Sequence, residues 1–98
     1  MTVQTDPEAT ETKYLHSFAN FEGKRVLEIG CGDGRLTWRY AAAARFVTGV
    51  DLNADELRLA MIDRPFDLAQ KVMLARADSV HLPFAAQNFD LAIFAWSF

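Results

Sequence analysis

The 98-residue sequence predicts an α/β fold with a parallel sheet, and three stretches support this prediction. Val26 to Ile29 is a mostly apolar run that ends in a glycine-rich turn and leads into a helical pattern. Phe46 to Val50 is a second apolar run, and Phe89 to Ala95 is another near the end of the chain. Short apolar runs separated by helix-length segments are typical of strands that are buried on both faces and joined by crossover helices.

The composition favours one small globular domain. Hydrophobic residues make up 51% of the chain. A domain of this length buries only about 60–70% of its unfolded surface, so a partner is expected. The net charge of −3 argues against a nucleic-acid or anionic-membrane surface. A single cysteine, an acidic start and the lack of an apolar stretch of roughly 20 residues predict a cytoplasmic protein without disulfides or membrane spans.

The chain is expected to begin with a disordered segment and a helix. Met1 to Thr5 is polar and is expected to be disordered. Asp6-Pro7-Glu8 predicts a helix start, because it supplies an N-cap, a proline at the first helical position and an early acidic residue. This helix is expected to run to about Phe18, ahead of the first strand.

Glycines separate the first strand from the helix that follows it. Gly30, Gly32 and Gly34 lack a Cβ, so the backbone can adopt positive φ and a ligand can lie directly against it. The second strand ends at Asp51, whose carboxylate can accept both hydroxyls of a ribose. Arg35 stands where a dinucleotide fingerprint of the form G-x-G-x-x-G requires glycine, which argues against NAD.

Helices are expected to connect the strands. After the glycine turn, helical spacing predicts a face packed on the sheet, formed by Leu36, Tyr40, Ala43 and Ala44. Asn53 is expected to cap a helix from Ala54 to about Ile62, with a buried stripe of Leu57, Ala60 and Met61. Val72 to Ala75 is the third strand. Right-handed crossovers then give the strand order 3-2-1-4, with the helices mainly on one face.

This topology leaves two surfaces that need covering. The segment from 78 to 88 is short and contains Pro83, so the second face of the sheet is expected to be nearly bare. The fourth strand, Phe89 to Ala95, would also be an unpaired edge. The sequence therefore predicts a homo-oligomer, or a fragment of a longer chain, in which these surfaces are covered.

The glycine turn and its neighbours resemble the motifs of class I S-adenosylmethionine-dependent methyltransferases. The first motif is Val26-Leu27-Glu28-Ile29-Gly30-Cys31-Gly32-Asp33-Gly34, the second is Val50-Asp51-Leu52, the third is Ala77-Asp78-Ser79 with Leu82-Pro83-Phe84, and the fourth is Phe89-Asp90-Leu91-Ala92-Ile93. The resemblance implies that residues 1–98 form a single truncated Rossmann-like domain, the N-terminal, cofactor-binding half of the family. The implied cofactor is S-adenosylmethionine, and the implied function is methyl transfer to an unidentified acceptor.

The resemblance implies a role for the first motif. Glu28 would lie near the methionine end of the cofactor and organise the glycine loop formed by Gly30, Cys31 and Gly32. A carboxylate that is satisfied by loop amides is a structural alternative that is compatible with this role. Catalysis by the Cys31 thiol is disfavoured, because the spacing provides no paired histidine.

The other motifs supply the nucleoside contacts that the resemblance implies. Asp51 would bind the ribose hydroxyls, and Leu52 would offer an apolar surface to the adenine. Asp78 would accept a hydrogen bond from the adenine amino group, and the backbone amide of Ser79 would contact the ring. Ala95, near the end of the fourth strand, completes the predicted cofactor-binding set. Since Asp51 lies at a strand end, its contribution to fold stability is expected to be small.

Functions from different classes stay open. The first is a methyltransferase, for which no catalytic residue is predicted because proximity and alignment supply most of the chemistry. The second is a truncated or degenerate cofactor-binding module without catalytic activity. A nicotinamide-dependent oxidoreductase ranks third. His16 and His81 have no companion ligands at zinc-type spacing, so no metal site is predicted.

Overall fold

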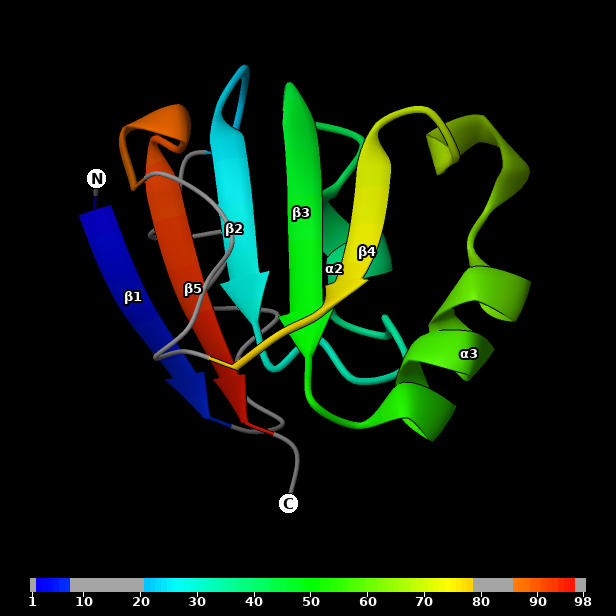
Figure 1. Cartoon of the computed structure of the whole chain (residues 1–98). Coiled ribbons are helices and arrows are strands. Elements are labelled where there is room, and N and C mark those ends of the chain that lie inside the picture. The colour runs from blue at the N-terminus through cyan, green and yellow to red at the C-terminus, as the bar shows by residue number, and fades with distance from the viewer. Residues whose placement is uncertain (1, 8–20, 79–85, 97–98) are drawn as a thin grey trace.

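A computed structural model describes residues 2–7, 21–78 and 86–96 of the chain. These residues form one parallel sheet with helical segments around it (Figure 1). The strands are β1 (Thr2–Pro7), β2 (Arg25–Ile29), β3 (Phe46–Asp51), β4 (Val72–Arg76) and β5 (Leu91–Trp96). The helices are α2 (Thr37–Tyr40) and α3 (Ala54–Asp63), with short 3-10 turns at Phe66–Leu68 and Ala86–Asn88.

The sheet has the order β1-β5-β2-β3-β4. The strands β4, β3, β2 and β5 lie side by side in this order, which confirms the predicted order 3-2-1-4 with β2 as the predicted first strand. Each of the four lies within two residues of its predicted bounds. Every pairing in the sheet is parallel, with Val26 of β2 opposite Val47 of β3 on one side and Leu91 of β5 on the other. The carboxyl ends of the strands therefore meet at one edge, at the bottom of Figure 1.

The strand β1 was not expected. Thr2 to Pro7 pairs with β5 in parallel, from Thr2 opposite Leu91 to Pro7 opposite Trp96. The predictions of disorder up to Thr5 and of a helix start at Asp6 are therefore wrong for these residues. An edge strand is held by its backbone pairing on one side, so it needs no apolar alternation, and it tolerates proline. The rest of the predicted helix, including His16, lies outside the described residues.

The two faces of the sheet have separate cores. On the face behind the sheet in Figure 1, α2 and the residues after it cover a cluster that includes Val26, Tyr40, Ala41, Ala44, Val47, Leu91 and Ile93. Phe21 stacks on Tyr40 there, with ring centroids 4.3 Å apart. The other face holds a smaller cluster of Leu27, Val50, Phe89 and Ala92.

The second face is not bare, contrary to the prediction. Leu27, Val50 and Ala92 at its centre are at most 1% exposed. The predicted fourth strand is not an unpaired edge either, because β1 lies along β5. The bare face and the unpaired fourth strand therefore no longer argue for self-association, and the homo-oligomer itself stays a prediction from the sequence.

The helices follow the predicted pattern only in part. The Asn53 side chain caps α3 by accepting the backbone N–H groups of Asp55 and Glu56, as predicted. Leu57 and Ala60 are buried as α3 packs on β4 and β3, but Met61 is exposed, because it lies one residue further around the helix. Ala43 is also exposed, since α2 ends at Tyr40 and the helical spacing does not continue to it.

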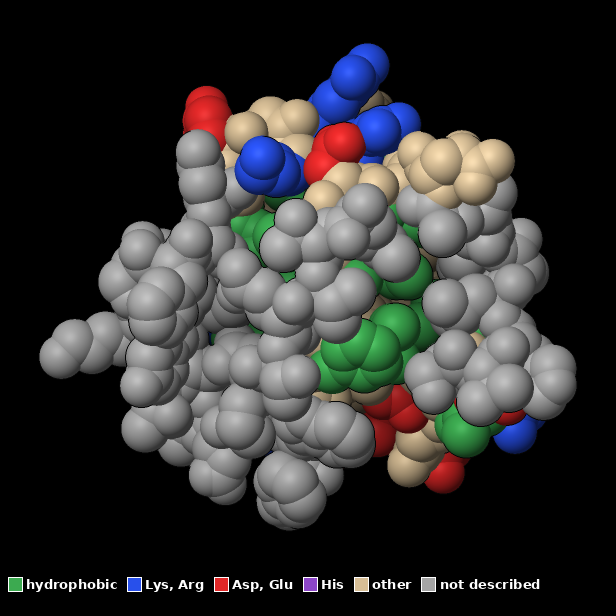
Figure 2. All heavy atoms as spheres, turned by 90° about the vertical axis from the view of Figure 1, so that its left-hand side faces the viewer, with side chains coloured by type: hydrophobic (Ala, Val, Ile, Leu, Met, Phe, Trp, Pro, Cys, Tyr) green, Lys and Arg blue, Asp and Glu red, His purple; other side chains and the backbone are tan. Residues whose placement is uncertain are grey.

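An ion pair joins the starts of β2 and β5. Asp90 accepts hydrogen bonds from the Arg25 guanidinium at 2.8 and 3.0 Å and from the Arg25 backbone N–H at 2.9 Å. The Asp90 N–H in turn donates to the Arg25 carbonyl at 2.8 Å. Charges of both signs meet at this end of the sheet, at the top of Figure 2. Within the described ranges, no helix is long and apolar enough to cross a bilayer.

Candidate functional site

The glycine loop follows β2 directly and is fastened to the end of β3. Gly30, Gly32 and Gly34 have φ values of 82°, 55° and 88°, a region that residues with a Cβ rarely adopt. The N–H groups of Gly30 and Cys31 both donate to the Val50 carbonyl, at 2.8 and 3.0 Å. The predicted tight turn is therefore confirmed, and its first residues lie over the neighbouring strand.

The backbone of β5 closes the other side of this loop. A Cβ added at Gly30 would lie 2.4 Å from the Ala95 carbonyl oxygen, a distance that no side chain tolerates. Only glycine therefore allows β2 to turn at this point without displacing β5. The structure thus brings Ala95, one of the predicted site residues, to the base of the loop through its backbone.

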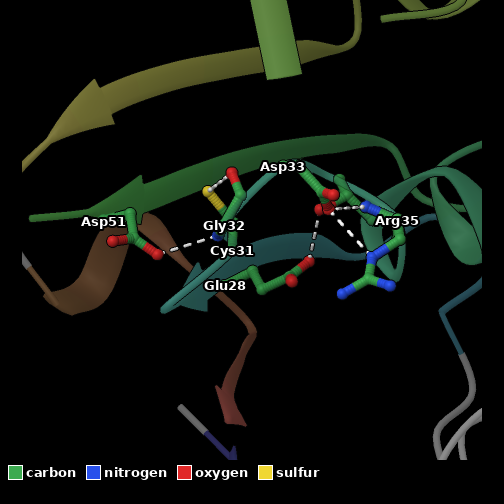
Figure 3. A network of polar contacts seen from close by, with 7 residues as sticks. Glu28, Cys31, Gly32, Asp33, Arg35 and Asp51 are labelled. Atoms are coloured by element: carbon green, nitrogen blue, oxygen red, sulfur yellow. Dashed lines mark hydrogen bonds and ion pairs between the residues drawn. The ribbon is translucent and has the colours of Figure 1, made fainter. Parts of the chain in front are cut away.

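Asp51 connects the loop to the start of α3. Its Oδ2 accepts the Gly32 N–H at 2.8 Å, and its Oδ1 accepts the Asn53 N–H at 2.8 Å. Figure 3 shows Asp51 facing the loop across the first of these contacts. An ionised carboxylate offers about four acceptor positions, so two of them are left for a ligand. The side chain is half-buried and is held in a fixed orientation.

The ends of β3 and β4 lie side by side at the same edge. The Ala77 N–H donates to the Asp51 carbonyl at 3.1 Å, which brings the half-buried Asp78 alongside. Arg76 Nε donates to the Leu52 carbonyl at 3.0 Å, and the Leu52 side chain is 58% exposed. An exposed apolar surface and a second carboxylate therefore neighbour Asp51. The predicted residues Ser79, His81 and Leu82-Pro83-Phe84 lie outside the described residues.

Glu28 lies beneath the loop and is fully buried. Its Oε1 accepts hydrogen bonds from the hydroxyl groups of Thr37 and Tyr40, the first at 2.8 Å. Both hydroxyls come from α2, so the carboxylate ties the strand before the loop to the helix after it. Hydrogen bonds of this kind offset the cost of burying a polar group.

The thiol of Cys31 is not available as a nucleophile. Cys31 is 5% exposed, and its burial, followed by the negative charges of Glu28 and Asp51, raises the pKa of the thiol well above its ordinary value. The reactive thiolate is therefore disfavoured at neutral pH. Among the residues that the structure describes, no three His, Cys, Asp or Glu side chains gather as metal ligands.

Sequence reasoning missed several residues that shape the loop. Thr37 had no assigned role, and Tyr40 was predicted only to pack on the sheet. A buried glutamate requires donors, and hydroxyl side chains on the next helix were a signal that could have been used. Trp38 also had no assigned role. In the structure a Cβ at Gly34 would lie 2.3 Å from its ring. This contact and the φ of 88° together favour glycine at the third position.

The fold and the site together define a class of protein. A glycine loop follows β2, and an acidic residue ends the neighbouring parallel strand β3. This is the Rossmann-like arrangement for binding a nucleoside. Residues 26–98 match the family described as "Methyltransferase domain". The chain therefore belongs to this methyltransferase family.

Two curated relatives are similar over most of this chain. A ubiquinone biosynthesis O-methyltransferase of Aromatoleum aromaticum is 44% identical over 76 residues, which cover 74% of the chain and 31% of that protein. A fatty-acid O-methyltransferase of Mycolicibacterium smegmatis is 38% identical over 77 residues, which cover 76% of the chain and 27% of that protein. The chain thus spans less than a third of the length of these relatives.

Solved structures share the fold. An S-adenosylmethionine-dependent methyltransferase from Mesorhizobium loti aligns with a TM-score of 0.73 and 30% identity, over 88% of this chain and 39% of that one. The phosphoethanolamine N-methyltransferase 1 of Haemonchus contortus, solved with phosphoethanolamine and S-adenosylhomocysteine, aligns with a TM-score of 0.76 and 27% identity. That alignment covers 88% of this chain and 18% of the other.

Proposed function

We propose that this chain is the S-adenosylmethionine-binding part of a methyltransferase. The observation that carries the proposal is the 2.8 Å hydrogen bond from the Gly32 N–H to Asp51 Oδ2. It places a glycine loop that a ligand can approach closely next to a carboxylate with acceptor positions to spare. The family membership of residues 26–98 supports the same function.

The residues at this edge fit a nucleoside. Each oxygen of Asp51 uses one acceptor position for a backbone N–H and keeps another, so the carboxylate would accept hydrogen bonds from the two ribose hydroxyls. The exposed Leu52 side chain would lie against the adenine, and Asp78 would accept a hydrogen bond from the adenine amino group. The amide of Ser79 is assigned to the adenine ring by resemblance alone.

The loop residues fit the other end of the cofactor. Gly30, Cys31 and Gly32 would contact it through their backbone, because the positive φ of both glycines gives the tight turn that a ligand can approach closely. Glu28 would hold the loop from below through its hydrogen bonds to α2. In this arrangement the second motif would bind the nucleoside of the cofactor, and the first motif would bind its methionine part.

The proposed reaction is a methyl transfer. When bound, the cofactor supplies a methyl group on a positively charged sulfur. An acceptor held beside the methyl group would form the new bond to carbon, the electron pair of the broken carbon–sulfur bond would stay on the sulfur to give S-adenosylhomocysteine, and the acceptor's proton would go to water. The described residues would bind the cofactor and orient it. Proximity and alignment supply most of the rate enhancement of such a reaction. The acceptor, a small molecule or a macromolecule, and a cytoplasmic setting are further parts of this proposal.

The alternative is a cofactor-binding module without turnover. It stays open because the chain spans less than a third of its curated relatives and because a fold does not by itself fix a reaction. Transfer of labelled methyl groups to candidate acceptors separates the two functions. Binding without transfer to any acceptor would favour the module.

Calorimetric titration of the 98-residue chain tests the cofactor. S-adenosylmethionine and S-adenosylhomocysteine are expected to bind, and Asp51→Asn is expected to weaken binding by about tenfold, since the ribose loses a charged acceptor. Asp63→Asn, at the far end of α3, removes the same charge and is the matched control. Tighter binding of NAD than of S-adenosylmethionine would overturn the proposal.

A further inference from the structure

Gly49 lies in the interior of β3, where a glycine weakens a strand. It stands opposite Glu28 of β2 and Leu74 of β4 in the sheet register. A Cβ added there would lie 3.1 Å from both Cβ and Sγ of Cys31, and 3.1 Å from Cδ2 of Leu74. Glycine within a strand often marks a close approach of another segment. Here the approaching segment is the loop that carries the proposed cofactor contacts.

Three consecutive residues of β3 fasten this loop. Gly49 leaves the space that the Cys31 side chain occupies. Val50 accepts the N–H groups of Gly30 and Cys31 through its carbonyl, and Asp51 accepts the N–H of Gly32. The steric contact and the hydrogen bonds therefore act on the same few loop residues, and the space at Gly49 determines how closely Cys31 can approach the sheet.

We propose that Gly49 is a positioning residue for the cofactor loop. This inference rests on the proposed function, because the ligand of the loop is taken to be S-adenosylmethionine. A methyl group at position 49 requires Cys31 or Leu74 to move by a few tenths of an ångström. Moving Cys31 also moves the amides of its neighbours Gly30 and Gly32. Asp51 stays in β3, so the position of these amides relative to its carboxylate changes.

The test compares Gly49→Ala with a control on the same strand. Thr48 is 4% exposed and faces the opposite side of the sheet, so Thr48→Ala changes the core without touching the loop. In the ligand-free chain, Gly49→Ala is expected to shift the amide NMR signals of Gly30 and Gly32, and Thr48→Ala is not. By calorimetry, Gly49→Ala is expected to bind S-adenosylmethionine about tenfold more weakly than the unaltered chain.

A double-mutant cycle separates positioning from a general loss of stability. Cys31→Gly removes the Cβ and Sγ atoms that would meet the new methyl group and leaves Leu74 Cδ2 as a neighbour at 3.1 Å, so Gly49→Ala should cost about threefold or less in affinity in that background. If Gly49→Ala alone does not fold, Cys31→Gly is expected to restore folding. Equal losses with and without Cys31→Gly, or failure of both variants to fold, would overturn the inference.

The proposed function can fail independently of this inference. If the unaltered chain does not bind S-adenosylmethionine, the cofactor assignment is wrong, whereas the ligand-free NMR signals still report whether Gly49 positions the loop. Unchanged Gly30 and Gly32 signals in Gly49→Ala would overturn the inference even if the cofactor binds. The two results are read from separate samples and do not depend on each other.

Discussion

The amide N–H of Gly32 donates to Oδ2 of Asp51 over 2.8 Å, and this contact joins the loop after β2 to the end of β3. The other oxygen of Asp51 accepts the Asn53 N–H at the start of α3. One carboxylate therefore holds three elements together at the proposed cofactor site. The expectation that Asp51 matters little for the fold must be revised, because its removal leaves two backbone donors without their partner.

Substitution of Asp51 is expected to lower both stability and affinity. Asp51→Ala removes the acceptor of two backbone N–H groups, and the free energy of unfolding should fall by about 1–3 kcal/mol. Asp51→Asn keeps one oxygen acceptor and the shape, so its loss of stability should be smaller. Urea unfolding measures this order, and Asp63→Ala is the charge-matched control. An unchanged unfolding free energy for Asp51→Ala would contradict the structural role.

The Tyr40 hydroxyl is expected to stabilise the fold through Glu28. Tyr40→Phe retains the ring that stacks on Phe21 and removes the hydroxyl that donates to Glu28 Oε1. Loss of a hydrogen bond to a buried carboxylate should lower the free energy of unfolding by about 1.5–3 kcal/mol.

Two further variants check this assignment by urea unfolding. In a Glu28→Gln background the acceptor carries no charge, so Tyr40→Phe should cost less there than in the unaltered chain. Phe46→Leu changes an aromatic residue of the other core and should show no coupling to Glu28. Equal costs of Tyr40→Phe in both backgrounds would show that the hydroxyl acts independently of Glu28.

The thiol of Cys31 is expected to resist alkylation in the folded chain. Burial raises its pKa, and the negative charges of Glu28 and Asp51 raise it further, so little thiolate forms at neutral pH. Iodoacetamide should react at least about tenfold more slowly with the folded chain than with the chain in urea. Mass spectrometry over time measures both rates. Rapid modification without denaturant would mean that the loop opens readily.

Much of the sheet could be predicted because its strands carry strong local signals. Apolar runs, glycines and the acid at the end of the second strand reflect burial and backbone conformation, which are properties of the residues themselves. The order of β4, β3, β2 and β5 then follows from right-handed crossovers. The position of Asp51 beside the loop was predictable for the same reason, since the carboxyl ends of parallel strands meet at one edge.

The features that were missed depend on tertiary contacts. The strand β1 has a polar sequence and is recognised only by its backbone pairing with β5. The donors Thr37 and Tyr40 matter because of where Glu28 lies, which spacing alone does not reveal. Gly49 resembles an ordinary residue of an apolar run until Cys31 is placed against it. Packing therefore decides these roles, and a pattern in one sequence does not.

The contact between Arg25 and Asp90 gives a prediction for acid stability. Hydrogen bonds from the Arg25 side chain and backbone hold the pKa of Asp90 below its ordinary value of 3.8. A carboxyl whose pKa is lower in the folded than in the unfolded chain stabilises the fold fully above the ordinary value. That contribution is lost as the pH falls through the lowered pKa, because the unfolded chain binds the proton first.

Comparison with Asp90→Asn isolates this effect. The difference in urea midpoint between the unaltered chain and Asp90→Asn should be constant from neutral pH down to about pH 5, and should shrink towards about pH 2. Since the two side chains are 36% and 38% exposed, about 1 M salt should reduce the difference at neutral pH. Asp55→Asn, which breaks the more exposed pair with Arg58, should show only a small difference at any pH. A midpoint difference for Asp90→Asn that is as large at about pH 2 as at neutral pH would mean that the effect of Asp90 comes from packing and not from its charge.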